Sequence, residues 1–171
     1  MTAARSLWSD RCGTAGAEMA LVAPLLLLMM FASFEVGRFF WGEHTVTKAV
    51  RDGARFAGRQ NFASMPCDGS ATNEAAIKNV VRFGKATVTD ADVPLLPYWD
   101  DEESITVSID CYDNAGADGA RVYDGIYTDR EEVPRVTVTA SVPYSPLLTS
   151  FGVLSSGINL NASSQAVVFG L

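Results

Sequence analysis

An uninterrupted apolar run near the N-terminus constrains this chain more than any other feature of its sequence. The run Met19–Phe34 carries no charged side chain, and apolar residues continue to Trp41 with only Glu35 and Arg38 as charged interruptions. As a helix, Met19–Trp41 is about 35 Å long, which is enough to cross the hydrocarbon core of a bilayer. Glu35 and Arg38 are three residues apart, so their side chains can pair on one face of that helix. The sequence therefore predicts a membrane-spanning helix over residues 19–41.

A cleaved secretory signal peptide is the main alternative for this run, with Arg5 and Arg11 as its basic N-terminal region. Signal peptidase requires small residues in an Ala-x-Ala-like pattern after the apolar run. Here the run ends in Ala32-Ser33-Phe34, which has phenylalanine where a small residue is needed. A buried core helix is the second alternative, and it fits an uninterrupted apolar run near the N-terminus poorly. The pattern favours a helix that stays in the membrane.

The charges that flank this helix do not fix its orientation. Two arginines precede the apolar run, and within about 20 residues of its end there follow four basic residues: Lys48, Arg51, Arg55 and Arg59. Basic residues counted alone would keep the C-terminal side in the cytoplasm. The short N-terminal side, the large polar C-terminal portion and the cysteines of that portion favour its export instead.

The segment just before the apolar run carries a recognisable pattern. Gly13 precedes the hydrophobic stretch, and Glu18 is the fifth residue after Gly13. This arrangement resembles the processing site of type IV-like prepilins, in which a prepilin peptidase cuts after the glycine. The continuation through the leucine run to Phe34-Glu35-Val36-Gly37-Arg38, and then the amphipathic stretch Ala49–Ala57, is similar to the TadE-like minor pseudopilins of tight-adherence (Tad/Flp) pili.

The resemblance implies cleavage between Gly13 and Thr14 and an assembly role for Glu18. Cleavage there would create an α-amino group on Thr14, and in a pilus-like assembly this amine pairs with the glutamate of a neighbouring subunit. A carboxylate at the edge of a membrane helix needs a partner, because carrying it to the bilayer centre costs about 2.5–3.5 kcal/mol. Glu18 would also lie in the first turn of the mature helix, where the macrodipole favours negative charge. The alternative is that Glu18 only caps the helix at the lipid headgroups.

The resemblance also implies a function and partners. The protein would be a minor pilin or pseudopilin of the bacterial inner membrane that takes part in assembling a Tad-type pilus for adhesion, or a related secretion apparatus. Its partners would be other pilin subunits, the prepilin peptidase, the inner-membrane assembly platform and membrane lipid. The second hypothesis is an unprocessed, single-pass, membrane-anchored periplasmic domain that binds a ligand or a partner.

Downstream of the membrane segment, the sequence predicts an α+β fold like that of the pilins. We expect a leader over residues 1–13, a long helix within 14–59 and a head domain over 60–171. The long helix should run from about Ala17 to Gly58, and the second half of its length carries a small-residue apolar stripe suited to packing on a sheet. A short helix capped by Thr72 and ending at Gly84 should follow. Alternating residues predict an antiparallel sheet of three or four strands, at 105–111, 136–142 and 158–168 and, more weakly, at 87–89.

Charge is distributed unevenly between these parts. The whole chain has a formal net charge of -7, and residues 60–171 hold six basic and fifteen acidic side chains, which gives this part a charge of -9. Binding to nucleic acid phosphates requires a basic face. The acidic head domain therefore excludes nucleic acid as a partner.

Two of the three cysteines of the chain lie in the predicted head domain and can form a disulfide there. Cys12 lies before the proposed cleavage site and would leave with the leader, so Cys67 and Cys111 remain as an even pair. In a segment outside the cytoplasm such a pair is expected to form a disulfide. Two buried free thiols are the alternative.

The sequence offers no candidate catalytic, metal or cofactor site. His44 is the single histidine, and no nucleophile is spaced to use it. No phosphate-binding glycine loop, nucleophile elbow or zinc spacing occurs. The acidic runs at 100–103 and 110–118 lack the ligand pattern of an EF-hand, so we expect them to be solvated rather than to bind calcium. We therefore expect a protein that is not an enzyme and holds no cofactor.

Overall fold

The computed structural model describes residues 12–116, 119–147 and 157–170, and describes side chains from Ala15 onward. The chain divides into two compact units, Met1–Arg38 and Phe39–Leu171, which we call the N-terminal unit and the head unit. Helix α1, Cys12–Gly58, starts in the first unit and ends in the second. Its start at Cys12 lies upstream of the start that we predicted near Ala17.

The N-terminal unit presents an apolar helix surface. The large hydrophobic side chains from Met19 to Val36 are exposed, and Leu21 is 80% exposed. Pro24 lies inside α1, and Ser33 donates a hydrogen bond to the carbonyl oxygen of Met29 one turn earlier. By length and composition this is a helix that can cross a membrane. It fits a single-pass membrane anchor, because a continuous helix satisfies its backbone hydrogen bonds internally in lipid.

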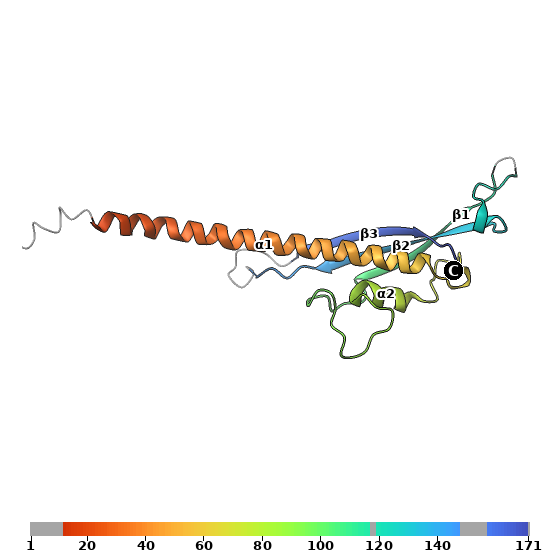
Figure 1. The fold of residues 1–171 in the computed structure, drawn as a ribbon, viewed down its shortest axis with the longest axis horizontal. Helices are drawn as coiled ribbons and strands as arrows, with labels where there is room; N and C mark the ends of the chain where they lie inside the picture. The colour runs from red at the N-terminus through yellow and green to blue at the C-terminus, as the bar shows by residue number, and fades with distance from the viewer. Residues whose placement is uncertain (1–11, 117–118, 148–156, 171) are drawn as a thin grey trace, which may run out of the picture. The chain divides into compact units, whose positions relative to one another are not determined.

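The head unit is built on a three-stranded antiparallel sheet in the order β1-β2-β3 (Figure 1). Its strands are β1, Ile105–Asp113; β2, Glu132–Pro143; and β3, Asn159–Val167. Alternate residues of β2 are buried, namely Val136, Val138, Ala140 and Val142. Because side chains alternate across a strand, these residues define a core face and leave the opposite, outer face to solvent. The observed strands and their inward residues confirm the three strong strand predictions.

The second half of α1 covers the core face of the sheet (Figure 1). Its buried stripe consists of Val46, Ala49, Val50, Ala54 and Ala57. Small residues in this part of α1 let the backbone approach its neighbours: a Cβ added at Gly42 would lie 2.9 Å from Leu160 of β3, and one at Gly58 would lie 2.9 Å from the carbonyl oxygen of Val167. The predicted packing of a small-residue helix face on a sheet is therefore confirmed.

Helix α2, Glu74–Phe83, contributes Ile77 and Val81 to the same core and ends at the left-handed Gly84. The prediction that Thr72 caps this helix is wrong. Asn73 occupies the N-cap position, but its side chain donates to Gln60 at 3.2 Å and does not cap the helix. The backbone N–H of Thr72 bonds to the carbonyl oxygen of Ser64. Thr72 and Asn73 thus form hydrogen bonds to residues that precede α2 and do not cap the helix.

The weak strand prediction at residues 87–89 is also wrong, because this segment is a loop. The head unit also contains the 3₁₀ helices η1 at Phe62–Ser64 and η2 at Gly125–Tyr127. Together these elements give the α+β architecture expected from the sequence: a long helix, a short second helix and a small antiparallel sheet.

Candidate functional site

The residues of the proposed processing site lie in the first turns of α1. Gly13 and Thr14 belong to the helix, and their side chains fall outside the described set. Glu18 is exposed. Residues four apart share a helix face, so an amine at Thr14 would lie one turn from the Glu18 carboxylate of the same chain. An exposed carboxylate in this position is available to a partner outside the chain.

Glu35 and Arg38 lie one turn apart near the end of the apolar segment. Glu35 is 6% exposed, whereas Arg38 is partly buried. A carboxylate with so little exposure is unusual on a helix whose other side chains are mostly open. The pairing of Glu35 with Arg38 stays a prediction.

The predicted disulfide is present in the head unit. Cys67 and Cys111 are joined, with Cα atoms 5.7 Å apart, and the bond connects the segment before α2 to strand β1 across 44 residues of sequence. Among the described residues, Cys67, Cys111 and Glu132 are the one group of three potential metal ligands that lie close together. Since both sulfurs are bonded to each other, this group offers a metal ion only one carboxylate.

The acidic runs use their carboxylates within their own loops. Asp101 accepts from the backbone N–H of Glu103 at 2.8 Å, and Asp113 accepts from the N–H of Ala115 at 2.8 Å. Asp68 likewise accepts from the N–H and hydroxyl of Ser70, and the N–H bond lowers the pKa of Asp68 below its ordinary value. These contacts are turn geometry rather than ligand geometry.

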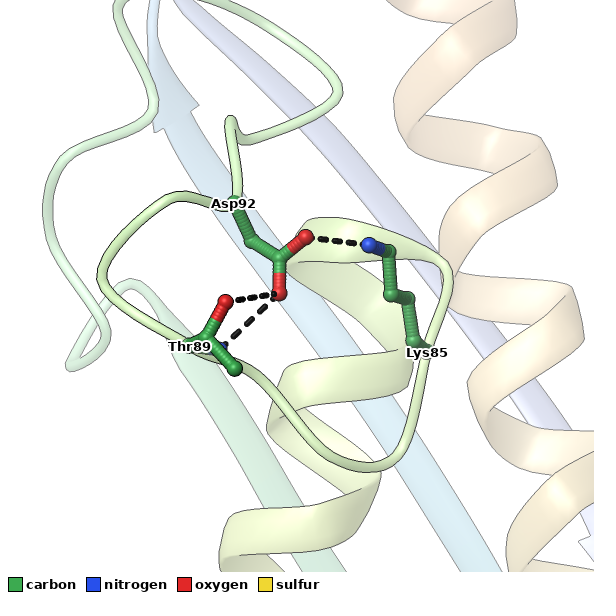
Figure 2. Close-up of polar contacts among 3 residues, drawn as sticks. All are labelled: Lys85, Thr89 and Asp92. Atoms are coloured by element: carbon green, nitrogen blue, oxygen red, sulfur yellow. Dashed lines mark hydrogen bonds and ion pairs between the residues drawn. The ribbon is translucent and has the colours of Figure 1, made fainter.

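A polar clasp closes the loop that follows α2 (Figure 2). Asp92 forms an ion pair with Lys85 and accepts hydrogen bonds from the backbone N–H of Thr89 at 2.9 Å and from the Thr89 hydroxyl at 3.1 Å. The Lys85 ammonium, followed by the Thr89 N–H, lowers the pKa of Asp92 from 3.8 to about 2. This clasp occupies the backbone donor of Thr89 and explains why residues 87–89 do not pair as a strand.

Replacing Lys85 with methionine is expected to raise the pKa of Asp92 towards 3.8, because the first of its stabilising partners is lost. The carboxyl is more acidic in the folded chain, so the clasp stabilises the loop above pH 3.8 and loses this effect as the pH falls through about 2. Carboxyl ¹³C NMR across that range measures the shift. Lys78→Met, which removes the partner of Glu74 instead, is the matched control and should leave Asp92 unchanged. An unaltered Asp92 titration in Lys85→Met would contradict the clasp.

A pocket that no sequence pattern predicted lies at the end of the sheet, where β1 is followed by the loop leading to β2. This tyrosine pocket has a volume of about 400 Å³ and is lined by Tyr112, Tyr123, Tyr127, Val133, Arg135 and Val167. Its residues come from all three strands and from the loop, so no spacing in the sequence groups them. The only feature of the sequence that could have indicated this pocket is the recurrence of tyrosine at positions 112, 123 and 127.

Comparison with known proteins gives one match. Residues 13–55 match a family model described as TadE-like protein. No curated protein and no solved structure matches the chain. The matched range covers the proposed processing site, the apolar segment and the first part of the stripe that packs on the sheet. The part of the chain from Gly13 to Arg55 is therefore a TadE-like segment, consistent with a protein of the Tad pilus system.

Proposed function

We propose that the protein is a minor pilin or pseudopilin that takes part in assembling a Tad-type pilus. In this proposal Met19–Trp41 crosses the bacterial inner membrane, the head lies on the periplasmic side, and a prepilin peptidase cuts between Gly13 and Thr14. The mature subunit then joins other pilin subunits on the inner-membrane assembly platform. Its role is structural and not enzymatic.

The observation that carries this proposal is the coincidence of three features in one helix. The TadE-like match covers residues 13–55, the apolar side chains of this range are exposed up to Val36, and Glu18 is an exposed carboxylate at the N-terminal edge of the apolar surface. An exposed apolar helix surface requires either lipid or neighbouring helices. A subunit that moves from a membrane into a helical bundle is surrounded first by lipid and then by neighbouring helices.

Two features of the head support its export. The disulfide between Cys67 and Cys111 is of a kind that persists in oxidising compartments such as the periplasm. The acidic character of residues 60–171 also suits an extracytoplasmic domain, because it does not attract the anionic cytoplasmic surface of the membrane.

A permanently anchored periplasmic domain that binds a ligand or partner is the second candidate. It shares the membrane helix and the exported head but has no use for cleavage after Gly13. Processing therefore distinguishes the two functions.

In cells that carry a Tad system, the mature protein is expected to begin at Thr14. Gly13→Leu should abolish cleavage, since a bulky side chain replaces the residue that precedes the cut. N-terminal sequencing of the membrane-extracted protein measures both results. Glu18→Ala is the informative companion variant: we expect it to be inserted and cleaved but to reduce incorporation into pili severely, since its carboxylate no longer pairs with the neighbouring amine. An intact leader on the wild-type protein would favour the anchored domain, and normal piliation with Glu18→Ala would exclude the pairing role.

A further inference from the structure

The tyrosine pocket has aromatic faces that the head unit leaves open. Tyr112 is 40% exposed and Tyr123 is 44% exposed, and Val167 beside them is 44% exposed. Tyrosine faces are costly to leave in water, and an open pocket of this size lies within the range of small-molecule sites. A ligand with a flat apolar side would therefore fit against the exposed rings.

The loop that supplies two of the tyrosines is held by a buried side chain. Asn114 is 0% exposed, and its amide donates to the carbonyl oxygens of Tyr123, Tyr127 and Arg130 at 3.1, 2.8 and 3.0 Å. Its own oxygen accepts from the N–H of Tyr123 at 2.7 Å. The hydroxyl of Tyr127 also donates to the carbonyl oxygen of Val168 at 2.7 Å. The backbone of the loop and the ring of Tyr127 are thus held in place before any ligand arrives, which reduces the entropy cost of binding.

The lining of the pocket includes a partly exposed guanidinium, that of Arg135. Arg135 lies over the ring of Tyr112, with its Cζ 4.5 Å from the ring centroid. Its ion pair with Asp110 is long at 3.5 Å, so the exposed part of the guanidinium is only weakly engaged; its Nε is buried and has no hydrogen-bond partner. Asp110 is itself more than half exposed. Donor and acceptor stand side by side on neighbouring strands, because Asp110 and Arg135 are register partners.

The outer face of the sheet continues from this pocket as an uncharged polar surface. Two successive sets of register partners lie beyond Arg135 on that face: Ser108–Thr137–Gln165 and Thr106–Thr139–Ser163. All six side chains are hydroxyls or an amide, and most are exposed. Thr137 Oγ1 has no hydrogen-bond partner. Together with Arg135 Nε, it accounts for both buried side-chain polar atoms that lack a partner in the described part of the chain, and both belong to this face.

We propose that the tyrosine pocket and the adjoining outer face of the sheet bind a neutral saccharide chain. One sugar ring would stack its C–H face on Tyr123 or Tyr112, and its hydroxyls would donate to Asp110 and accept from Arg135. Further sugars would lie along the hydroxyl and amide side chains of the outer face. Hydroxyl groups are both donors and acceptors, so they match an aspartate–arginine pair and a surface of Ser, Thr and Gln.

The charges of the head select against other ligands. An anion would meet a domain segment with a charge of -9 and would compete with Asp110 for Arg135. A cation that used the tyrosine faces would lie beside the guanidinium that already stacks on Tyr112. A neutral ligand with many hydroxyls avoids both repulsions.

The test is binding of neutral hexasaccharides to the full chain in lipid nanodiscs, which avoids sugar-based detergents. Maltohexaose, cellohexaose and mannohexaose are titrated and followed by saturation-transfer NMR. We expect at least one of them to bind with a Kd in the millimolar range or below. Arg135→Gln and Tyr123→Ala should each weaken that binding by about tenfold or more, because each removes a main contact of the sugar ring.

Two matched variants control for indirect effects. Ile126→Ala alters an exposed residue of the same loop outside the tyrosine pocket, and Arg51→Gln removes an exposed arginine from α1. Both should bind like the wild type. Gln165→Ala serves as a third site variant and should also weaken binding, because it removes an exposed amide from the outer face without touching the loop.

Three results would overturn the proposal: no binding by any neutral hexasaccharide at millimolar concentration, equal binding by the wild type and all three site variants, or tighter binding by a hexauronate than by its neutral counterpart. The measurement uses purified protein, so it stands or falls independently of leader processing and pilus assembly.

Discussion

Gly53→Val is expected to lower the free energy of unfolding of the head unit by about 3 kcal/mol, towards the upper end of the range for overpacked cores. A Cβ at this position would lie 2.3 Å from Cγ2 of Val81, closer than any van der Waals contact. Val81 is fully buried and β-branched, so it cannot turn away into a second rotamer at low cost. Helices α1 and α2 would have to move apart where Gly53 faces Val81. Thermal or denaturant unfolding, followed through the near-ultraviolet signal of the buried Trp99, measures the loss.

Gly37→Val is the matched control, because a Cβ at Gly37 meets no atom within 4 Å. It should leave the stability of the head unit unchanged. Adding Val81→Ala to Gly53→Val should restore part of the lost stability, because it creates the space that the new side chain needs. Equal stability of the Gly53 and Gly37 variants would show that the contact between the two helices is looser than described.

Removing the disulfide should lower the unfolding free energy by about 2–4 kcal/mol, since the unfolded chain regains the freedom of the 44-residue segment that the bond closes. The change is Cys67→Ser together with Cys111→Ser, and the melting temperature measures it. Reduction with dithiothreitol should lower the melting temperature of the wild type to that of the double variant, because Cys67 is exposed to the reductant.

Cys12→Ser controls for the loss of a thiol as such, since Cys12 is not part of the bridge. This variant should have the same melting temperature as the wild type in the absence of reductant. A double variant that keeps the wild-type melting temperature would mean that the sheet alone restrains the segment before α2.

The strands and the long helix were predictable because their patterns are local and periodic. Alternation in β1 and β3, and the small-residue stripe of α1, report directly which side chains face the core. The misjudged elements were decided by contacts between residues that no period connects. Asn73 is drawn to Gln60 and Thr72 to Ser64, so neither caps α2, while Asp92 reaches back to Thr89 and removes its donor from any sheet.

The membrane-proximal candidate site was predictable for a different reason. Its features lie within one helix, where sequence spacing is also spatial spacing. The disulfide followed from an even number of cysteines in a segment that we expected to be exported. The tyrosine pocket had no such signal. Its grouping depends on strand register, which sets Asp110 beside Arg135, and on the buried Asn114, which bonds to several residues of the intervening loop and holds it closed.

The way α1 meets β3 governs when the head can fold. Gly42 faces Leu160, Gly58 faces Val167, and the N–H of Phe169 bonds to the carbonyl oxygen of Gly58. The two partners in each contact stand at opposite ends of the head unit's sequence, so these contacts cannot form until the last strand has been synthesised. Until then the part of α1 that contacts β3 stays open to water and to other chains, as is usual for folds rich in long-range contacts. A ribosome that stalls before β3 would thus leave helix α1 without its packing partner, and such a chain is expected to be bound by chaperones or degraded by proteases.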